Sequence, residues 1–300
     1  MLYQDYFDKY LKILSFRNFR PHSVSSYCTY IRPYLEYLEQ VLQKRPEEAS
    51  WDDYRDFIMF IQSERDLNDR TVNTMITHLS LFHSTVLDKE WNKKQIPFRK
   101  FDEYVPYIPS HERITFFINS IQDLKVKAMV SLMYSSGMRV SEVCSLKCGD
   151  IYRSQGYILV RTSKSRIPRQ AICSRNAMAI VIEYWKSLPL PRPGKDNYLF
   201  PKQSGKDAPI DTFFPLRRMI DQEKLLGWDH LITCHTLRRA CAIHLYENKY
   251  QLEDIRKVLG HSNVNTTRLY LRPVINSPKG IRSPFDQESS AEKEAPSCRN

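Results

Sequence analysis

Residues 235–270 decide the fold, and they read HTLRRACAIHLYENKYQLEDIRKVLGHSNVNTTRLY. Apolar residues recur in this stretch at helical spacing, which predicts one helix from about residue 236 and a second helix that stops at Gly260. Tyr270 is expected on, or at the end of, the short helix that follows. Three polar motifs accompany these helices in a fixed order: His235-Thr236-Leu237-Arg238, Gly260-His261-Ser262 and Thr266-Thr267-Arg268-Leu269-Tyr270.

His235 and Arg238 stand three residues apart at the start of a predicted helix, so both side chains share one face beside free backbone N–H groups. A helix start of this kind binds anions. Taken alone, the pattern is equally typical of a capped helix with a solvated arginine, and most of the 18 tyrosines are expected to be packing residues. The order and spacing of the three motifs together carry the functional information.

Two further motifs lie upstream. Residues 136–142, SGMRVSE, place Arg139 at a turn between two apolar helical patterns, with a helix over 111–135 before it and a short helix over 139–147 after it. Residues 156–173, GYILVRTSKSRIPRQAIC, carry β-branched runs on both sides of a polar centre, which predicts a hairpin with Lys164 at its tip. Helices resume from about residue 175, and a proline-rich surface stretch over 189–201 interrupts them.

The amino-terminal third is predicted to be a separate helical module. Residues 1–92 contain four apolar stripes at helical spacing, with helix starts at Ser50 and at Asn68-Asp69 and a kink or split at Pro33. Residues 93–110 lose the periodicity and contain three prolines and several basic residues, which predicts an extended basic linker. The polar tail over 274–300 is expected to be disordered.

Length and composition narrow the class of protein. A chain of 300 residues suits two domains, and 45 Lys+Arg against 34 Asp+Glu give a net charge of +11, which favours a polyanionic partner such as nucleic acid. Mildly basic soluble proteins are common, so charge alone leaves this open. Seven scattered cysteines without a paired ligand pattern predict reduced thiols and no metal site. No signal peptide or apolar run long enough to span a bilayer is evident, so a cytoplasmic protein without membrane contact is expected.

At these motifs the chain resembles the tyrosine recombinase (phage integrase) family. The resemblance implies a mainly α fold with a small β-sheet or hairpin in the catalytic domain, built as a two-domain DNA clamp. Residues 1–92 would be the helical core-binding (SAM-like) domain, 93–110 the linker and 111–273 the catalytic domain. One departure is that Leu271-Arg272-Pro273 leads directly into a polar tail, where many members continue with an apolar helix that docks on a neighbouring copy.

The resemblance also implies a role for each motif. Tyr270 would attack a DNA phosphodiester, form a 3′-phosphotyrosine and release a 5′-hydroxyl. Arg139 and Arg238 would bind the non-bridging oxygens, because planar permanent cations suit the negative charge of a five-coordinate phosphorus. Glu142 would orient these groups, although an acid on a helix surface is an equally open interpretation.

Proton transfer would fall to three other residues. Lys164 would protonate the leaving 5′-oxygen, with Arg161 and Arg166 as neighbouring cations that could instead contact the DNA backbone. His235 would assist proton movement at Tyr270, and His261 would donate a hydrogen bond to the scissile phosphate; either histidine could instead be structural.

The implied partner is double-stranded DNA, bound by a homo-tetramer, with accessory DNA-bending proteins as further candidates. No cofactor or metal is expected, because the phosphotyrosine retains the energy of the phosphodiester. Basic side chains outside the catalytic set are candidate DNA contacts, although a charge run is also typical of a solvated face. These candidates are Arg70, Lys93, Lys94, Arg99, Lys100, Arg166 and Arg239.

Three functions compete at this point. The first is site-specific strand transfer that integrates, excises, inverts or resolves DNA. The second is a DNA-binding or architectural protein that keeps the fold and acts by occupancy. The third is a relaxase similar to type IB topoisomerases. Retention of the whole implied catalytic set favours the first.

Overall fold

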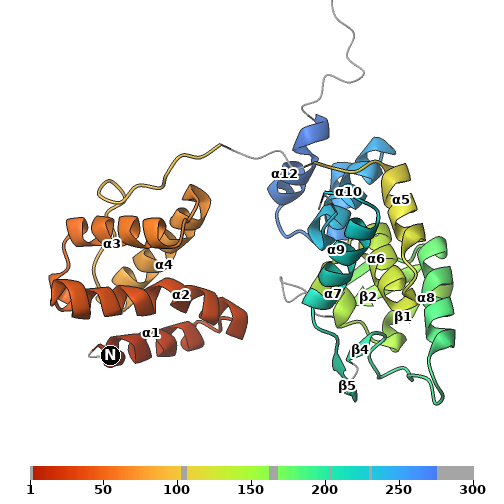
Figure 1. Ribbon diagram of the computed structural model, residues 1–300, viewed down its shortest axis with the longest axis horizontal. Helices are drawn as coiled ribbons and strands as arrows, with labels where there is room; N and C mark the ends of the chain where they lie inside the picture. The colour runs from red at the N-terminus through yellow and green to blue at the C-terminus, as the bar shows by residue number, and fades with distance from the viewer. Residues whose placement is uncertain (1–2, 103–106, 162–167, 203–204, 230–231, 276–300) are drawn as a thin grey trace, which may run out of the picture. The chain divides into compact units, whose positions relative to one another are not determined.

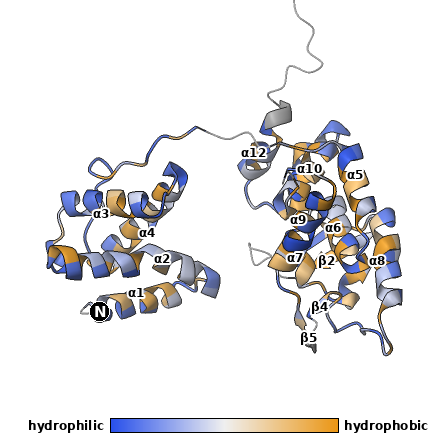
Figure 2. Cartoon of the chain, in the orientation of Figure 1, coloured by the Kyte–Doolittle hydropathy of each residue, from blue (hydrophilic) through white to orange (hydrophobic). Residues whose placement is uncertain are grey.

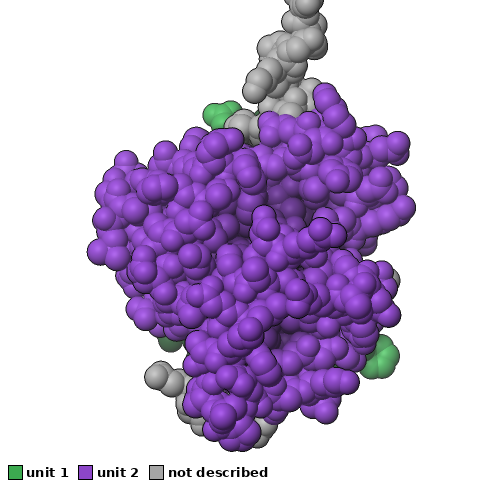
Figure 3. Space-filling model, turned by 90° about the vertical axis from the view of Figure 1, so that its right-hand side faces the viewer, with its two compact units in different colours: residues 1–104 green, residues 105–300 purple. Residues whose placement is uncertain are grey.

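A computed structural model of the chain describes residues 3–102, 107–161, 168–202, 205–229 and 232–275 (Figure 1). The chain forms two compact units, Met1–Tyr104 and Val105–Asn300, which Figure 3 colours separately. Most described residues are helical, and the strands form two small antiparallel sheets in the second unit. The predicted fold class, mainly α with a small β-sheet, is therefore confirmed. None of the helices in the described ranges is long and apolar enough to cross a membrane.

The first unit is built from four main helices around an aromatic core. Apolar and polar residues lie side by side along these helices, as amphipathic packing requires (Figure 2). Tyr10, Tyr34, Tyr54, Phe57 and Phe82 are fully buried among them. The helices are α1 (Gln4–Phe16), α2 (Pro21–Tyr37), α3 (Trp51–Glu64) and α4 (Asp69–Thr85), with short helical turns at Leu38–Leu42 and Pro46–Glu48.

Side chains start two of these helices as predicted. Ser50 accepts a hydrogen bond from the backbone N–H of Asp53 at 3.2 Å, and Asn68 accepts one from Thr71 at 2.9 Å. Of the kink or split predicted at Pro33, the split is absent, because α2 runs through this residue as one helix. A proline removes only one backbone donor, and burial of the helix on both sides of Pro33 keeps it continuous.

The beginning of the predicted linker packs on the first unit. Ile96 is buried in the aromatic core, and the side chain of Asn73 on α4 bonds both backbone groups of Arg99, at 2.8 Å and 2.9 Å. The guanidinium of Arg99 also pairs with Asp69 at 3.3 Å. The two units therefore divide between Tyr104 and Val105, inside the segment 93–110.

The second unit surrounds a buried central helix, α6. Its residues Ala128, Met129, Val130, Leu132 and Met133 are all fully buried. Contacts to α6 come from α5, α7, α8, α9, α10 and β3. The helices of this unit are α5 (His111–Ser120), α6 (Leu124–Ser136), α7 (Val140–Cys144), α8 (Arg175–Ser187), α9 (Phe213–Leu225), α10 (Cys234–Glu247), α11 (Leu252–Leu259) and α12 (Val264–Ile275).

The strands form a three-stranded sheet and a separate pair. β1 (Ile151–Tyr152), β2 (Tyr157–Val160) and β3 (Arg169–Ile172) lie in the order β1-β2-β3, and β4 (Pro201–Lys202) pairs with β5 (Gly205–Pro209). The predicted hairpin is present as β2 and β3. Its tip, with Lys164 and Arg166, lies outside the described residues.

Two expectations about the second unit need correction. The single helix predicted over 111–135 is two helices, because Asp123 caps a new start and accepts backbone bonds from Lys125 at 2.9 Å and Val126 at 3.2 Å. The pair β4–β5 was not predicted. At the other end, α12 continues to Ile275, and residues 276–300, most of the tail expected to be disordered, lie outside the described residues.

Candidate active site

Arg139 is positioned by a sharp turn between α6 and α7. Gly137 ends α6 in the left-handed conformation at φ +61°, and a Cβ there would lie 2.7 Å from Leu259 Cδ2, so this turn packs tightly against the end of α11. Arg139 follows at the start of α7. Its backbone N–H and its Nη1 both donate to Glu142, at 2.8 Å and 2.9 Å. Glu142 thus caps α7 and holds Arg139 at once.

Glu142 also binds a second arginine, Arg169, which was not predicted to be part of the site. Arg169, at the start of β3, donates from Nη2 to Glu142 Oε2 at 2.7 Å and from Nη1 to the carbonyl of Val258 at 2.5 Å. Arg238 Nη1 lies 3.9 Å from the same carboxylate. Three guanidinium groups therefore share one buried carboxylate, and the excess positive charge favours binding of an anion.

Arg238 ties together three chain segments from the centre of the unit. It is 1% exposed, and it donates from Nη1 to the carbonyl of Gly137 at 2.6 Å and from Nη2 to the carbonyl of Leu259 at 2.7 Å. The same Nη2 lies 3.0 Å from His261 Nε2. Burial, and then the charge of Arg139, lowers the pKa of Arg238 to about 10, so it remains a cation at neutral pH.

The contacts of His261 fix its protonation. A guanidinium only donates, so Nε2 of His261 accepts from Arg238, and Nδ1 carries the proton and donates to Thr267 Oγ at 2.9 Å. Burial, and then the surrounding arginines, lowers the pKa of His261 to about 3. His261 is therefore neutral at physiological pH, and its Nε2 is an acceptor in this form.

Tyr270 faces His235 across the site. The hydroxyl of Tyr270, on α12, lies 3.1 Å from His235 Nε2, near the start of α10, and the tyrosine is 8% exposed. Its ring meets His235 and His261 edge to face, at centroid distances of 5.4 Å and 5.0 Å. Burial, and then Arg239 and its neighbouring arginines, lowers the pKa of His235. The neutral imidazole can therefore accept the proton of the Tyr270 hydroxyl.

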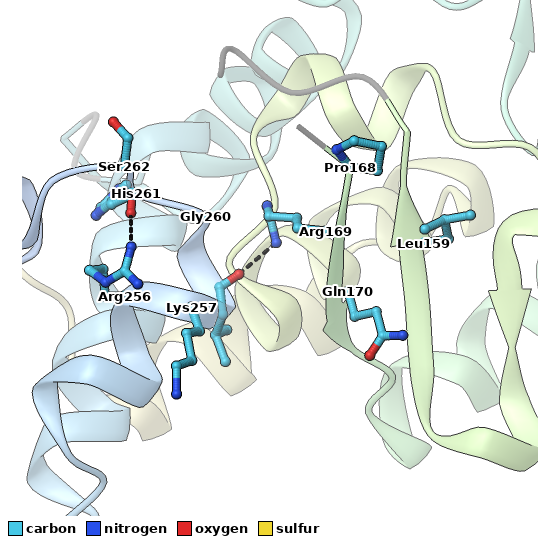
Figure 4. Close-up of a pocket in the computed structure, with 10 residues that line it drawn as sticks. Leu159, Pro168, Arg169, Gln170, Arg256, Lys257, Gly260, His261 and Ser262 are labelled. Carbon is cyan, nitrogen blue, oxygen red and sulfur yellow. Dashed lines mark hydrogen bonds between the residues drawn. The ribbon is translucent and has the colours of Figure 1, made fainter. Parts of the chain in front are cut away.

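A cleft of about 680 Å³ opens beside His261, between β3 and the turn after α11 (Figure 4). Arg256 braces this turn by donating to the carbonyl of His261 at 2.6 Å, and it pairs with Glu253 at 2.7 Å. Arg169 reaches the carbonyl of Val258 from the opposite wall. The residues that line the cleft are Leu159, Pro168, Arg169, Gln170, Arg256, Lys257, Val258, Gly260, His261 and Ser262.

The residues of this site lie in a region of the chain that matches a known family of sequences. The sequence model of the Phage integrase family matches residues 110–275, and that of the phage integrase N-terminal SAM-like domain matches residues 6–93. The chain belongs to the phage integrase family. All three motifs of residues 235–270, together with Arg139 and Glu142, fall within the first match.

Curated members of this phage integrase family cover most of the chain. Tyrosine recombinase XerC of Bacillus pumilus is 31% identical over 241 residues, which are 75% of this chain and 77% of that protein. A tyrosine recombinase of Agathobacter rectalis is 30% identical and covers 68% and 70%. Tyrosine recombinase XerA of Pyrococcus horikoshii is 28% identical and covers 77% and 80%.

Solved integrase structures share the fold. The Tn1549 transposon integrase in complex with circular intermediate DNA has a TM-score of 0.69 at 18% identity, over 88% of this chain and 94% of that chain. A lambda integrase dimer bound to a COC' core site has a TM-score of 0.69 at 16% identity, over 93% and 78%. XerH bound to difH substrate has a TM-score of 0.66 at 18% identity, over 85% and 77%.

The structure of this phage integrase family member brings together six of the residues singled out from the sequence. They are Arg139, Glu142, His235, Arg238, His261 and Tyr270. Arg239 joins them, with its guanidinium carbon 5.2 Å from the centre of the Tyr270 ring. Lys164 and Arg166 lie outside the described residues.

The other candidate DNA contacts lie on the first unit. Arg70 is exposed and stacks on Phe101 at 5.1 Å, whereas Arg99 is half-buried and paired. Lys93, Lys94 and Lys100 are exposed.

Sequence reasoning missed Arg169 and Thr267 as parts of the site. Arg169 stood in the predicted hairpin but was given no role there, and only its charge beside a strand could have marked it. Thr267 was visible within the motif that ends at Tyr270, but its partner, His261, could be identified only from the fold. Asp150 accepts a hydrogen bond from the backbone N–H of Lys147 at 3.1 Å and pairs with Arg161, so it has a structural role beside the site.

Proposed function

We propose that this protein is a site-specific DNA recombinase that cleaves and rejoins DNA through a 3′-phosphotyrosine on Tyr270. One observation carries the proposal: the Tyr270 hydroxyl lies 3.1 Å from a neutral His235, beside three arginines that share a single carboxylate. A nucleophile, a base and an anion site thus occupy one place, as phosphoryl transfer requires.

The proposed chemistry begins with attack by Tyr270. Its oxygen forms a bond to phosphorus, its proton passes to His235 Nε2, and the bond from phosphorus to the 5′-oxygen breaks. Lys164 is proposed to give the leaving oxygen its proton. The new phosphodiester retains the energy of the old one, so a 5′-hydroxyl from another strand can reverse the reaction.

Arg139 and Arg238 are proposed to hold the non-bridging oxygens. Both are permanent cations, and Glu142 fixes the guanidinium plane of Arg139 at 2.9 Å. Removal of a donor to the developing negative charge typically lowers rates by about 10²–10³.

His261 can donate to the same phosphate after a change of tautomer. In the free site its Nε2 accepts from Arg238. When Arg238 Nη2 turns to a phosphate oxygen, Nε2 can carry the proton, and the hydroxyl of Thr267 can donate to Nδ1 instead of accepting from it. A hydroxyl partner supports both tautomers, which suits a residue that must change its role on substrate binding.

Double-stranded DNA is the proposed partner. The Tn1549 integrase and XerH structures that share this fold contain DNA, and the chain carries a net charge of +11. Exchange between two duplexes requires four strand cleavages, and each copy carries one Tyr270, so we propose a tetramer on DNA. Accessory DNA-bending proteins are proposed as further partners, and the cytoplasm is the proposed location.

The two units are proposed to divide the work. Residues 1–92 would form the core-binding domain and residues 111–273 the catalytic domain, and together they would clamp the duplex. Arg70, Lys93, Lys94 and Lys100 are proposed to contact the DNA backbone, which positions the enzyme without reading sequence.

A denaturing capture of covalent adducts from fragmented genomic DNA tests this function. The intact protein should retain DNA with one enriched sequence, and Tyr270→Phe should retain none. Tyr250→Phe, which changes an exposed tyrosine of the same unit, is the matched control and should behave as the intact protein. A spread of unrelated sequences would favour a relaxase, and tight binding without any adduct would favour action by occupancy.

A further inference from the structure

Arg239 lies against the face of the Tyr270 ring. It follows Arg238 on α10, but it stands apart from the guanidinium groups around Glu142. Its guanidinium carbon lies 5.2 Å from the ring centre of Tyr270, while the rings of His235 and His261 approach the same ring edge to face. The tyrosine ring is therefore enclosed by one cation and two imidazoles.

The charge of Arg239 is not neutralised by any carboxylate in the part of the chain that the structure describes. Within the described ranges, no aspartate or glutamate oxygen lies within 4.0 Å of its guanidinium, and its buried Nε has no hydrogen-bond partner. A half-buried, unpaired cation acts most strongly on the groups that it faces. Here these are the Tyr270 ring, through a cation–π contact, and His235.

We propose that Arg239 is a positioning residue for the nucleophile, which holds the Tyr270 ring so that its hydroxyl stays against His235. This inference rests on the proposed function, in which Tyr270 is the nucleophile. The ring plane fixes the direction of the hydroxyl, and a displacement of about 1 Å at a reacting atom can lower a rate by about 10²-fold. In the alternative considered from the sequence, Arg239 contacts the DNA backbone, and its guanidinium would then point toward DNA and not toward Tyr270.

The charge of Arg239 also acts on the pKa of His235. The groups that face His235 are Arg238 and Arg239 on its own helix, Arg139 from the start of α7, Tyr270 on α12, and His261. After burial, Arg239 is the strongest of the charges that lower the pKa of His235. Loss of this charge should therefore raise the pKa of His235 and protonate the proposed base at a higher pH.

Nuclear magnetic resonance on the DNA-free protein tests the inference without any recombination assay. The variants are Arg239→Gln, Arg239→Lys and, as the charge-matched control, Arg268→Gln, which changes an exposed arginine on the helix of Tyr270. Arg239→Gln should raise the titration midpoint of the His235 ring, whereas Arg239→Lys and Arg268→Gln should nearly preserve it. A 3-fluorotyrosine at position 270 should change its ¹⁹F shift in both Arg239 variants and not in the control.

Cleavage kinetics separate positioning from DNA contact, with the duplex recovered by adduct capture as the probe. Arg239→Gln and Arg239→Lys should each lower the cleavage rate at saturating DNA by about tenfold or more, with little change in affinity. An unchanged rate with a weakened affinity would overturn the proposal and assign Arg239 to the DNA backbone. Unmoved His235 and ¹⁹F signals would also overturn it, whether or not the protein recombines DNA.

Discussion

At the scale of single residues, the proposed change of tautomer at His261 depends on Thr267. The threonine is completely buried, and its hydroxyl accepts the Nδ1 proton of His261 at 2.9 Å. The preceding residue on the same helix, Thr266, is exposed. The two threonines therefore allow a matched comparison of a buried residue whose hydroxyl bonds His261 with an exposed residue of the same type.

Thr267→Val should weaken both the fold and the chemistry. The substitution keeps the shape but leaves a buried imidazole N–H without an acceptor, which costs about 1–3 kcal/mol. His261 also loses the partner that allows its change of tautomer. The midpoint temperature of thermal unfolding and the rate of adduct formation should both fall in Thr267→Val, whereas Thr266→Val should change neither. Equal effects of the two variants would contradict the role given to Thr267.

The rate of cleavage should fall in acid because of His235. Burial and nearby arginines lower the pKa of this histidine below 6.5, so the neutral, proton-accepting form predominates at and above that pH. Above pH 6.5 the cleavage rate should therefore no longer change with the protonation of His235. The rate should decline as the pH falls through the lowered pKa of His235. The pH profile of single-turnover cleavage measures this. A decline that begins well above pH 6.5 would contradict a neutral base at this position.

At the scale of elements, the site is built where helices end. Gly137 closes α6 and Gly260 closes α11, both in the left-handed conformation, and Arg238 bonds the carbonyls of Gly137 and Leu259. The side chain of Arg169 then passes over Gly260, where a Cβ would lie 2.2 Å from its Cδ. Only a glycine satisfies both the backbone conformation and this close approach.

Gly260→Ala should therefore disrupt the site more than its backbone strain alone would. Gly227, after α9, also has φ +66° but has open space at its Cβ, so Gly227→Ala reports the strain without the clash. We expect Gly227→Ala to lower stability by about 1 kcal/mol and Gly260→Ala to lower it more, because Arg169 must also leave Glu142. Chemical unfolding measures both. Equal losses would mean that the contact with Arg169 contributes nothing.

The sequence predicted these elements where a local signal exists. Gly260 as a helix end, Ser50 and Asn68 as helix starts and the β2–β3 hairpin all follow from short-range chemistry. The break before α6 was missed because the apolar spacing continues through Ile121, and the cap at Asp123 looked like any surface acid. Arg169 was missed because its partners come from α7 and α11, and contacts between distant segments leave no local pattern.

At the scale of the whole molecule, each unit has a hydrophobic core of its own, and each is matched by a separate family model. Ile96 and the bonds between Asn73 and Arg99 place the start of the predicted linker in the first core. The isolated first unit should therefore be more stable when this segment is included.

A fragment of residues 1–104 should be more stable than a fragment of residues 1–92. Burial of an isoleucine side chain contributes about 1.5–3 kcal/mol, and the shorter fragment loses Ile96 with its flanking hydrogen bonds. Urea unfolding of the two fragments compares them. Equal stabilities would instead place the end of the folded unit at residue 92.

The most direct test of the central claim is to identify the covalent bond itself. Adducts of the intact protein with its captured DNA are digested with protease and nuclease, and the modified peptide is sequenced by mass spectrometry. The account predicts a nucleotide joined through its 3′-phosphate to Tyr270, and a free 5′-hydroxyl on the released strand. A modification on any other residue, or a 5′-phosphate on the released strand, would contradict it.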